Sequence, residues 1–189
     1  GVGLGAGTYN RMLRPYTEIR SVDRAASWAQ LEAVQRDNTA SPVRCVGLVL
    51  ETRPDHIDAD EVVRLRRLGC TKVQLGVQSL RDDILARNER GHDTQATKRA
   101  LAVLRSFGFK CLVHWMPNLL GATPDDDIED AARLHADPDL RPDEVKVYPC
   151  ALIETAALMQ DYVAGRWRPY DDATLTDVLI AVAVWFHSR

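Results

Sequence analysis

The stretch that most constrains the fold is residues 51–79, ETRPDHIDADEVVRLRRLGCTKVQLGVQS, together with the apolar run before it. Val46–Leu50 is continuously apolar, which is typical of a strand covered on both faces in a parallel sheet. Val73–Val77 predicts a second strand, and polar side chains follow both strands at their carboxyl ends. The order strand, helix, strand predicts a βαβ unit with parallel strands.

The helix between these two strands has recognisable ends. Asp58, followed three residues later by Glu61, forms a capping-box pattern at its start. Gly69 stands where a residue of left-handed conformation ends a helix. The apolar face of this helix consists of Val62, Val63, Leu65 and Leu68.

The alternation of strands and helices continues along the chain. Further strands are predicted at Cys111–Met116 and Glu144–Tyr148. Polar or aromatic side chains end every strand, which favours a barrel mouth over the single switch point of a doubly wound sheet. We therefore predict an α/β fold, a partial (β/α) barrel of about four parallel strands with flanking helices. The helices are predicted over residues 24–36, 58–68, 80–87, 93–108, 123–135, 153–164 and 172–186.

Length and composition limit the alternatives. A chain of 189 residues with 46% hydrophobic content can bury one sizeable core. We expect residues 1–43 to form a partial N-terminal segment with one helix, and residues 44–189 to form the barrel core. The net charge of −3 gives no broad basic face, and the apolar stretch 175–186 is too short to cross a membrane. Four cysteines in a chain of this length indicate a reducing, cytoplasmic location.

The cysteines argue against a metal centre made by this chain. Cys45, Cys70 and Cys111 stand at or just before predicted strand starts, so we expect buried structural thiols at the floor of the barrel. Cys150 alone falls near the mouth, the edge of the sheet where the strands end. The gaps of 25, 41 and 39 residues match no closely spaced ligand motif, so no metal ligand is predicted.

The polar residues after the first two strands are candidates for a binding site. Glu51 and Arg53 follow the first strand, and Gln78 and Ser79 follow the second. Each has a structural alternative: Glu51 and Arg53 pair with each other, and Ser79 caps the next helix. A site and a set of local contacts both remain open at this point.

Further candidates stand on the later elements. His114 lies in a strand and is alternatively a core histidine, whereas Arg90 and His92 lie in a turn where charges are commonly solvated. The acidic run Asp125–Asp127, which follows a Thr123 cap, is interpreted as a helix start with no catalytic role. A metal hydrolase using His92, His114 and Glu51 is a weaker alternative, because no HxH or HExxH spacing supports it.

Several segments together resemble a known family. They are ETRPD at 51–55, LGCTKVQLGVQS at 68–79, NERGHD at 88–93, FGFKCLVHWMPNLLGATPDDD at 107–127 and RPDEVKVYPC at 141–150. In this order they resemble the radical S-adenosylmethionine (SAM) domain of the Elongator catalytic subunit family, in its bacterial type. That family carboxymethylates the wobble uridine of tRNA and has also been described as a histone acetyltransferase.

The resemblance implies a set of cofactors and partners. The cofactors are S-adenosylmethionine and a 4Fe-4S cluster, with acetyl-CoA as co-substrate of the full-length enzyme. The partners are tRNA and other Elongator-like subunits or a second copy of the chain, with no membrane. Glu51 and Arg53 would contact the amino and carboxylate ends of S-adenosylmethionine, and Gln78 and Ser79 its ribose or the substrate. The residues expected to line the rest of the mouth are Arg90, His92, His114, Met116, Asn118 and Tyr148.

Three family features have no counterpart in this sequence: three closely spaced cysteines that hold the cluster, an acetyltransferase domain, and a glycine-rich second-strand segment, unless Gly1–Gly7 is a remnant of it. We therefore expect a fragment of a longer enzyme that is inactive alone. The alternative is a non-catalytic half-barrel that serves as a binding or assembly module. Either way, an unpaired sheet edge predicts self-association of the isolated chain.

Overall fold

The computed structural model describes residues 26–187, and the chain divides into two compact units, Gly1–Cys45 and Val46–Arg189. The glycine-rich segment Gly1–Gly7 lies outside the described residues. In the first unit, the helix expected over residues 24–36 is α2, Trp28–Ala40. It begins later than predicted because Ser27 forms a capping box with Gln30.

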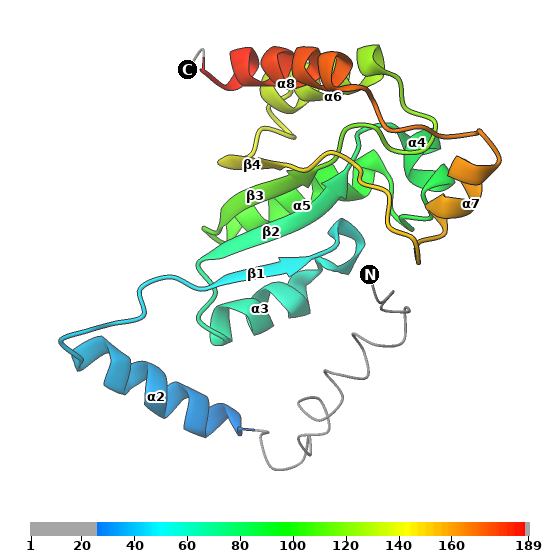
Figure 1. Ribbon diagram of the computed structural model, residues 1–189. Helices are drawn as coiled ribbons and strands as arrows, with labels where there is room; N and C mark the ends of the chain where they lie inside the picture. The colour runs from blue at the N-terminus through cyan, green and yellow to red at the C-terminus, as the bar shows by residue number, and fades with distance from the viewer. Residues whose placement is uncertain (1–25, 188–189) are drawn as a thin grey trace. The chain divides into compact units, whose positions relative to one another are not determined.

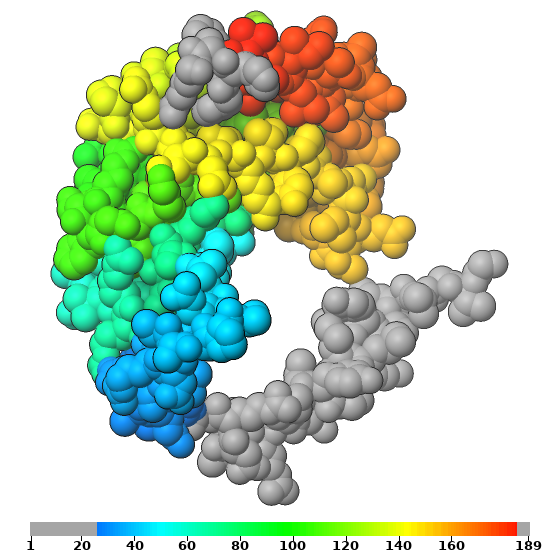
Figure 2. Space-filling view, turned by 90° about the vertical axis from the view of Figure 1, so that its left-hand side faces the viewer, coloured from blue at the N-terminus to red at the C-terminus, as the bar shows by residue number. Residues whose placement is uncertain are grey.

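The second unit contains a parallel sheet with the strand order β1-β2-β3-β4 (Figure 1). Its strands are β1 (Val49–Thr52), β2 (Lys72–Gln78), β3 (Lys110–Trp115) and β4 (Glu144–Val147). In Figure 2 the colours pass in chain order from β1 in cyan to β4 in yellow, in agreement with this order. The predicted fold of four parallel strands with flanking helices is confirmed.

Helices cover one side of this sheet, and α5 is seen behind β2 and β3 in Figure 1. Buried residues of α3, α5, α6 and α8 form one hydrophobic cluster with the odd-numbered side chains of β2 and β3. The helix predicted over 153–164 is shorter than expected. The helical segments of this unit are η2 (Pro54–His56), α3 (Ala59–Arg67), α4 (Asp82–Arg87), α5 (Thr94–Ser106), α6 (Pro124–Ala136), α7 (Leu158–Val163) and α8 (Asp172–His187).

The first strand differs from its prediction. The structure places β1 at Val49–Thr52 rather than at Val46–Leu50, and Val46 is 81% exposed. Val49 is also half exposed, because within residues 26–187 β1 pairs with β2 alone and lies at an edge of the sheet. Val63, expected on the buried face of α3, is exposed as well, whereas Val62 and Leu65 are buried.

Strand β2 alternates between its two sides. Val73, Leu75 and Val77 are fully buried toward the helices. Lys72, Gln74 and Gly76 occupy the alternate positions and therefore belong to the other side of the sheet, where the Gln78 amide also lies, next to Gly76. We call this side the inner face.

The prediction of buried structural thiols is confirmed for two of the three cysteines expected at the floor of the barrel. Cys70 and Cys111 are buried, and burial raises the pKa of the Cys111 thiol to about 11. Cys150 is half-buried beyond β4. Cys45 is exposed, so its prediction as a buried thiol at the barrel floor is wrong; it belongs to the first unit and not to the sheet. Among the helices of the described part, none is long and apolar enough to cross a membrane.

Candidate functional site

The inner face gathers polar side chains from all four strands. The register pairs Glu51 with Gln74, Gly76 with His114, and His114 with Lys146. Paired residues of a parallel sheet point to the same face, so these side chains form neighbouring rows. The inner face thus brings together residues that are 95 positions apart in the sequence, from Glu51 to Lys146.

Gly76 lies at the centre of this arrangement. A Cβ atom at this position would lie 3.1 Å from Gln78 Nε2 and 3.3 Å from Arg90 Nη2. The same Arg90 nitrogen donates a hydrogen bond of 3.2 Å to the carbonyl of Gly76. The amide of Gln78 and the guanidinium of Arg90 therefore occupy space that any larger residue at position 76 would take.

Arg53 lies next to Arg90. Its guanidinium donates two hydrogen bonds to the carboxylate of Asp55, at 2.9 Å and 2.5 Å, which lowers the pKa of Asp55. The Arg53 guanidinium also packs against Gly91, where a Cβ atom would lie 2.8 Å from Arg53 Nη2. Burial, followed by the positive charge of Arg53, lowers the pKa of Arg90. The local pairing of Arg53 with Glu51 is not observed, because Asp55 takes that place.

His114 connects the acidic and the aromatic parts of the inner face. Its Nδ1 lies 3.8 Å from Glu51 Oε1, and its ring meets the Tyr148 ring edge-on at 5.2 Å between centroids. The ammonium of Lys146 lies 4.6 Å from the centroid of the Tyr148 ring. Burial, and then the charge of Lys146, lowers the pKa of His114, so its imidazole is neutral at pH 7.

Several polar atoms around Gly76 are buried without a partner. Within the described residues, four such atoms on or over the inner face have no hydrogen bond: Gln74 Nε2, Gln78 Oε1, Arg90 Nε and His114 Nε2. Folded proteins leave few buried polar atoms unsatisfied, so a cluster of four indicates a place for a polar ligand. Glu51 supplies a negative charge and Arg90 a positive one, which suits a zwitterion such as the amino-acid end of S-adenosylmethionine.

Three of the sequence-predicted residues use their polar groups elsewhere. The Ser79 hydroxyl donates to Asp130 at 2.7 Å, and both ring nitrogens of His92 lie within 3.3 Å of backbone carbonyl oxygens. Ser79 also does not cap α4, which begins at Asp82. The Asn118 side chain binds the backbone of residues 168 and 170.

The other predicted residues lie at the mouth. Met116 is half-buried just past β3, and its N–H donates to the Gln78 carbonyl at 2.9 Å. The structure thus brings together seven predicted residues on or beside the inner face: Glu51, Arg53, Gln78, Arg90, His114, Met116 and Tyr148.

Sequence reasoning missed Gln74, Gly76 and Lys146. A signal for two of them was present, because KVQLGVQ alternates apolar and polar or small residues over the whole of β2. The alternation distinguishes a strand with one polar face from a strand covered on both faces.

The acidic start of α6 is more than a helix start. Thr123 caps the helix with Asp126, as expected, but Asp127 is buried and accepts hydrogen bonds from the Asn118 N–H and the Tyr170 hydroxyl. Burial, reinforced by the nearby Asp130 and Asp126 charges, raises the pKa of Asp127 to about 6.

The residues present do not fit an iron–sulfur cluster. The four cysteines are dispersed, and no group of three His, Cys, Asp or Glu side chains that could hold a metal occurs in residues 26–187. The arrangement needed for a metal hydrolase is equally lacking there, because His92 is bound to backbone carbonyls.

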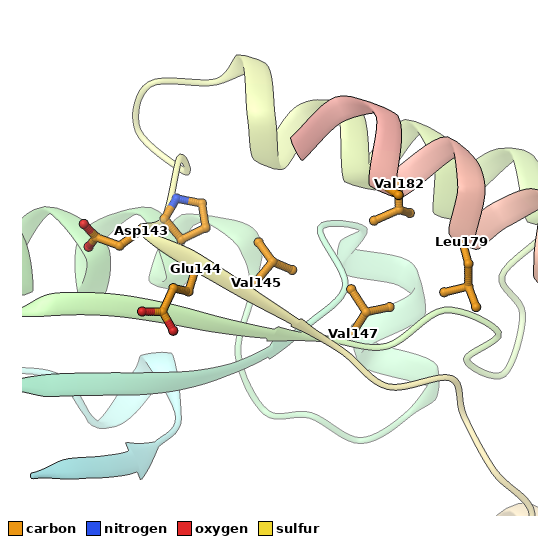
Figure 3. Close-up of a pocket in the computed structure, with 8 residues that line it drawn as sticks. Asp143, Glu144, Val145, Val147, Leu179 and Val182 are labelled. Atoms are coloured by element: carbon orange, nitrogen blue, oxygen red, sulfur yellow. The ribbon is translucent and has the colours of Figure 1, made fainter. Parts of the chain in front are cut away.

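A groove of about 510 Å³ lies on the side of β4 that faces away from the inner face (Figure 3). Val145 and Val147 line it from the strand, and Leu179 and Val182 line it from α8. Because Lys146 alternates with these valines, the groove and the inner face lie on different sides of the sheet.

Comparisons with known proteins identify relatives of this chain. The chain matches tRNA uridine(34) acetyltransferase of Dehalococcoides mccartyi at 40% identity over 149 residues, which are 79% of this chain and 32% of that protein. Elongator complex protein 3 of Saccharomyces cerevisiae is 32% identical over 142 residues, 75% of this chain and 26% of that protein. This chain therefore spans about a third or less of the length of these curated relatives.

Solved structures of other proteins have a similar fold. The archaeal Methanocaldococcus infernus Elp3 superposes with a TM-score of 0.79 at 34% identity, covering 85% of this chain and 37% of that one. HemN from Escherichia coli shares the fold, with a TM-score of 0.63 at 18% identity over 86% of this chain and 37% of that one. The family model of the radical SAM superfamily matches residues 31–135, more than half of the sequence. This chain belongs to the radical SAM superfamily.

Proposed function

We propose that this chain is the S-adenosylmethionine-binding part of a longer enzyme that modifies uridine 34 of tRNA. The observation that carries the proposal is the group of four unpartnered polar atoms around Gly76 on the inner face. The names of the relatives, tRNA uridine(34) acetyltransferase and Elongator complex protein 3, support the substrate. In the proposed reaction acetyl-CoA is the co-substrate and a carboxymethyl group is added to the uridine, in the cytoplasm.

The proposed roles follow from the chemistry of each side chain. Arg90 has a free Nε and binds the carboxylate of the cofactor, with Arg53 beside it, while Glu51 binds the amino group. The unpartnered Gln78 Oε1 accepts a hydrogen bond from a ribose hydroxyl. When bound, and reduced by one electron from a 4Fe-4S cluster held elsewhere in the longer enzyme, S-adenosylmethionine would release methionine and supply a 5′-deoxyadenosyl radical.

The outer part of the mouth suits a nucleobase. Tyr148 is 52% exposed, and its ring is fixed by the edge contact with His114 and by the ammonium of Lys146. An exposed, fixed aromatic ring is a platform on which an unpaired base stacks. We assign Tyr148 to the uracil ring, with Met116 and the neutral His114 imidazole beside it.

Binding to the 189-residue chain tests the site directly. Equilibrium dialysis with labelled S-adenosylmethionine should show saturable binding, and Arg90→Ala should raise the dissociation constant about tenfold. Arg105→Ala is the matched control, since Arg105 also donates to backbone carbonyls, but from α5 to residues 138 and 139. Wild-type affinity in Arg90→Ala, or equal losses in both variants, would reject the assignment.

A chimera tests the reaction. The 149 matched residues of the Dehalococcoides mccartyi relative are replaced by those of this chain, and the protein is reconstituted anaerobically with iron and sulfide. Release of 5′-deoxyadenosine, and modification of uridine 34 only when acetyl-CoA is present, are the expected results. No release from a chimera with a fully loaded cluster would leave a binding or assembly module as the better account.

A further inference from the structure

The end of β2 has an unusual backbone conformation. Gln78 has a φ of +69°, in the left-handed region that residues other than glycine seldom adopt, and the register with β3 shifts between Gly76 and Gln78. The next N–H, that of Ser79, turns back to the Val77 carbonyl at 2.9 Å. Such a conformation is unfavourable for a residue that has a side chain, and it persists only when its surroundings hold it.

A buried carboxylate on α6 holds the residues that follow. Asp130 is 1% exposed, and its Oδ2 accepts hydrogen bonds of 2.7 Å from both the Ser79 hydroxyl and the Leu80 N–H. Its other oxygen faces Arg81 Nε at 3.8 Å and Arg133 Nη1 at 3.7 Å. Both contacts to Oδ2 are short and buried, so the loss of this acceptor would leave two buried donors without a partner.

The chain has little freedom between this anchor and Gln78. Ser79 follows Gln78 directly, and the Gln78 carbonyl is bound on its other side by the Met116 N–H. With both neighbours fixed, the left-handed backbone of Gln78 sends its side chain back over Gly76, where Nε2 lies 3.1 Å from the Cβ position.

We propose that Asp130 is a positioning residue, which acts through Ser79 and Leu80 to hold the Gln78 amide over Gly76 in the cofactor site. The role rests on the proposed function of the inner face. Asp130 itself does not touch the cofactor. Without its carboxylate, the Ser79 hydroxyl and the Leu80 N–H are buried without a partner, and the turn at Gln78 relaxes.

The chain offers a matched control on the same helix. Asp127, one turn before Asp130, is also buried and also accepts one backbone N–H and one hydroxyl hydrogen bond, from Asn118 and Tyr170. Asp127→Ala therefore removes an equivalent set of contacts without touching the end of β2. Asp130→Asn is the conservative variant, because an amide oxygen in the Oδ2 position still accepts both hydrogen bonds.

The experiment compares Asp130→Ala, Asp130→Asn and Asp127→Ala in the 189-residue chain. It measures the thermal midpoint, the side-chain amide resonances of Gln78 by NMR, and the dissociation constant of S-adenosylmethionine by equilibrium dialysis. Asp130→Ala should shift the Gln78 resonances and weaken binding at least tenfold. Asp130→Asn should restore most of both, and Asp127→Ala should lower only the thermal midpoint.

The outcomes separate the two proposals. Unchanged Gln78 resonances in Asp130→Ala would overturn the positioning role, as would equal effects of Asp130→Ala and Asp127→Ala on Gln78. Absence of binding to the wild-type chain would contradict the proposed function, while the NMR comparison would still decide whether Asp130 positions Gln78.

Discussion

Replacing Gly76 by alanine separates the stability of the sheet from the integrity of the site. The backbone at Gly76 does not require glycine, and alanine is favoured over glycine inside a strand by about 0.5–1 kcal/mol. The new Cβ atom would contact only the flexible ends of Gln78 and Arg90 closely, at 3.1 Å and 3.3 Å. We therefore expect the free energy of unfolding of Gly76→Ala to change by less than about 1 kcal/mol.

Cofactor binding should respond more strongly than stability. Displacing Arg90 weakens its hydrogen bond to the Gly76 carbonyl and moves the guanidinium from the carboxylate it is proposed to bind. A hydrogen bond to a charged group contributes about 1.5 kcal/mol at the low end of its range, which corresponds to roughly tenfold weaker binding. Urea unfolding followed by fluorescence and dialysis with labelled S-adenosylmethionine measure the two quantities on the same samples.

Gly47→Ala is the matched control for this substitution. A Cβ atom at Gly47 would meet only Thr71 Oγ1 at 3.6 Å, an ordinary contact, at the amino end of the sheet. Its affinity for S-adenosylmethionine should equal that of the wild type. If Gly76→Ala also binds with wild-type affinity, the space over Gly76 is not part of the cofactor site and the reasoning fails.

Three further predictions concern other parts of the chain. Because burial raises the pKa of Asp127 from 3.8 to about 6, the stability that it contributes is present below pH 4 and is lost as the pH rises through 6. Asp127→Asn should therefore be more stable than the wild type at pH 7, by about 3 kcal/mol at most, and as stable as the wild type at pH 4. Thermal melts at both pH values measure this, and equal melting temperatures at pH 7 would contradict it. A maleimide should label the exposed Cys45 quickly at pH 8 and the buried Cys70 and Cys111 roughly 100-fold more slowly, as followed by mass spectrometry, and comparable rates would show that the sheet opens. Val49→Lys on the edge strand should reduce concentration-dependent association in light scattering, and an unchanged apparent mass would remove β1 as the contact.

The parts of the fold that could be predicted from the sequence are those set by local signals. The Thr123 cap and the turn at Gly69, which has a φ of +84°, stand where the sequence places them. The position of β2 agrees with the sequence prediction, but its inner face does not follow from it, because the prediction uses the polar residues after the strand and not the alternation within it. The start of β1 could not be predicted, since edge position depends on which strands are present and not on the composition of Val46–Leu50.

The sequence predicts which residues lie near the candidate site more reliably than it predicts the direction of their side chains. Residues after strand ends do gather at one edge, as the parallel sheet requires. Whether a side chain there faces the inner face or a helix depends on one backbone angle, and Gln78 and Asn118 both have positive φ values that the sequence does not announce. Gln78 turns toward the inner face, whereas the Asn118 amide binds residues 168 and 170.

Helix α6 binds two of the predicted site residues, Asn118 and Ser79, through two buried carboxyl groups. Asp127 and Asp130 are three positions apart, so both face the same side of the helix, toward the ends of the strands. Asp127 binds the backbone of Asn118 after β3, and Asp130 binds Ser79 after β2. One helix face therefore fixes the ends of two neighbouring strands from outside the site. The geometry at Gly76 then depends on Asp130, which lies outside the proposed site, and a substitution of Asp130, unlike one of Asp127, should change the site without removing any group from it.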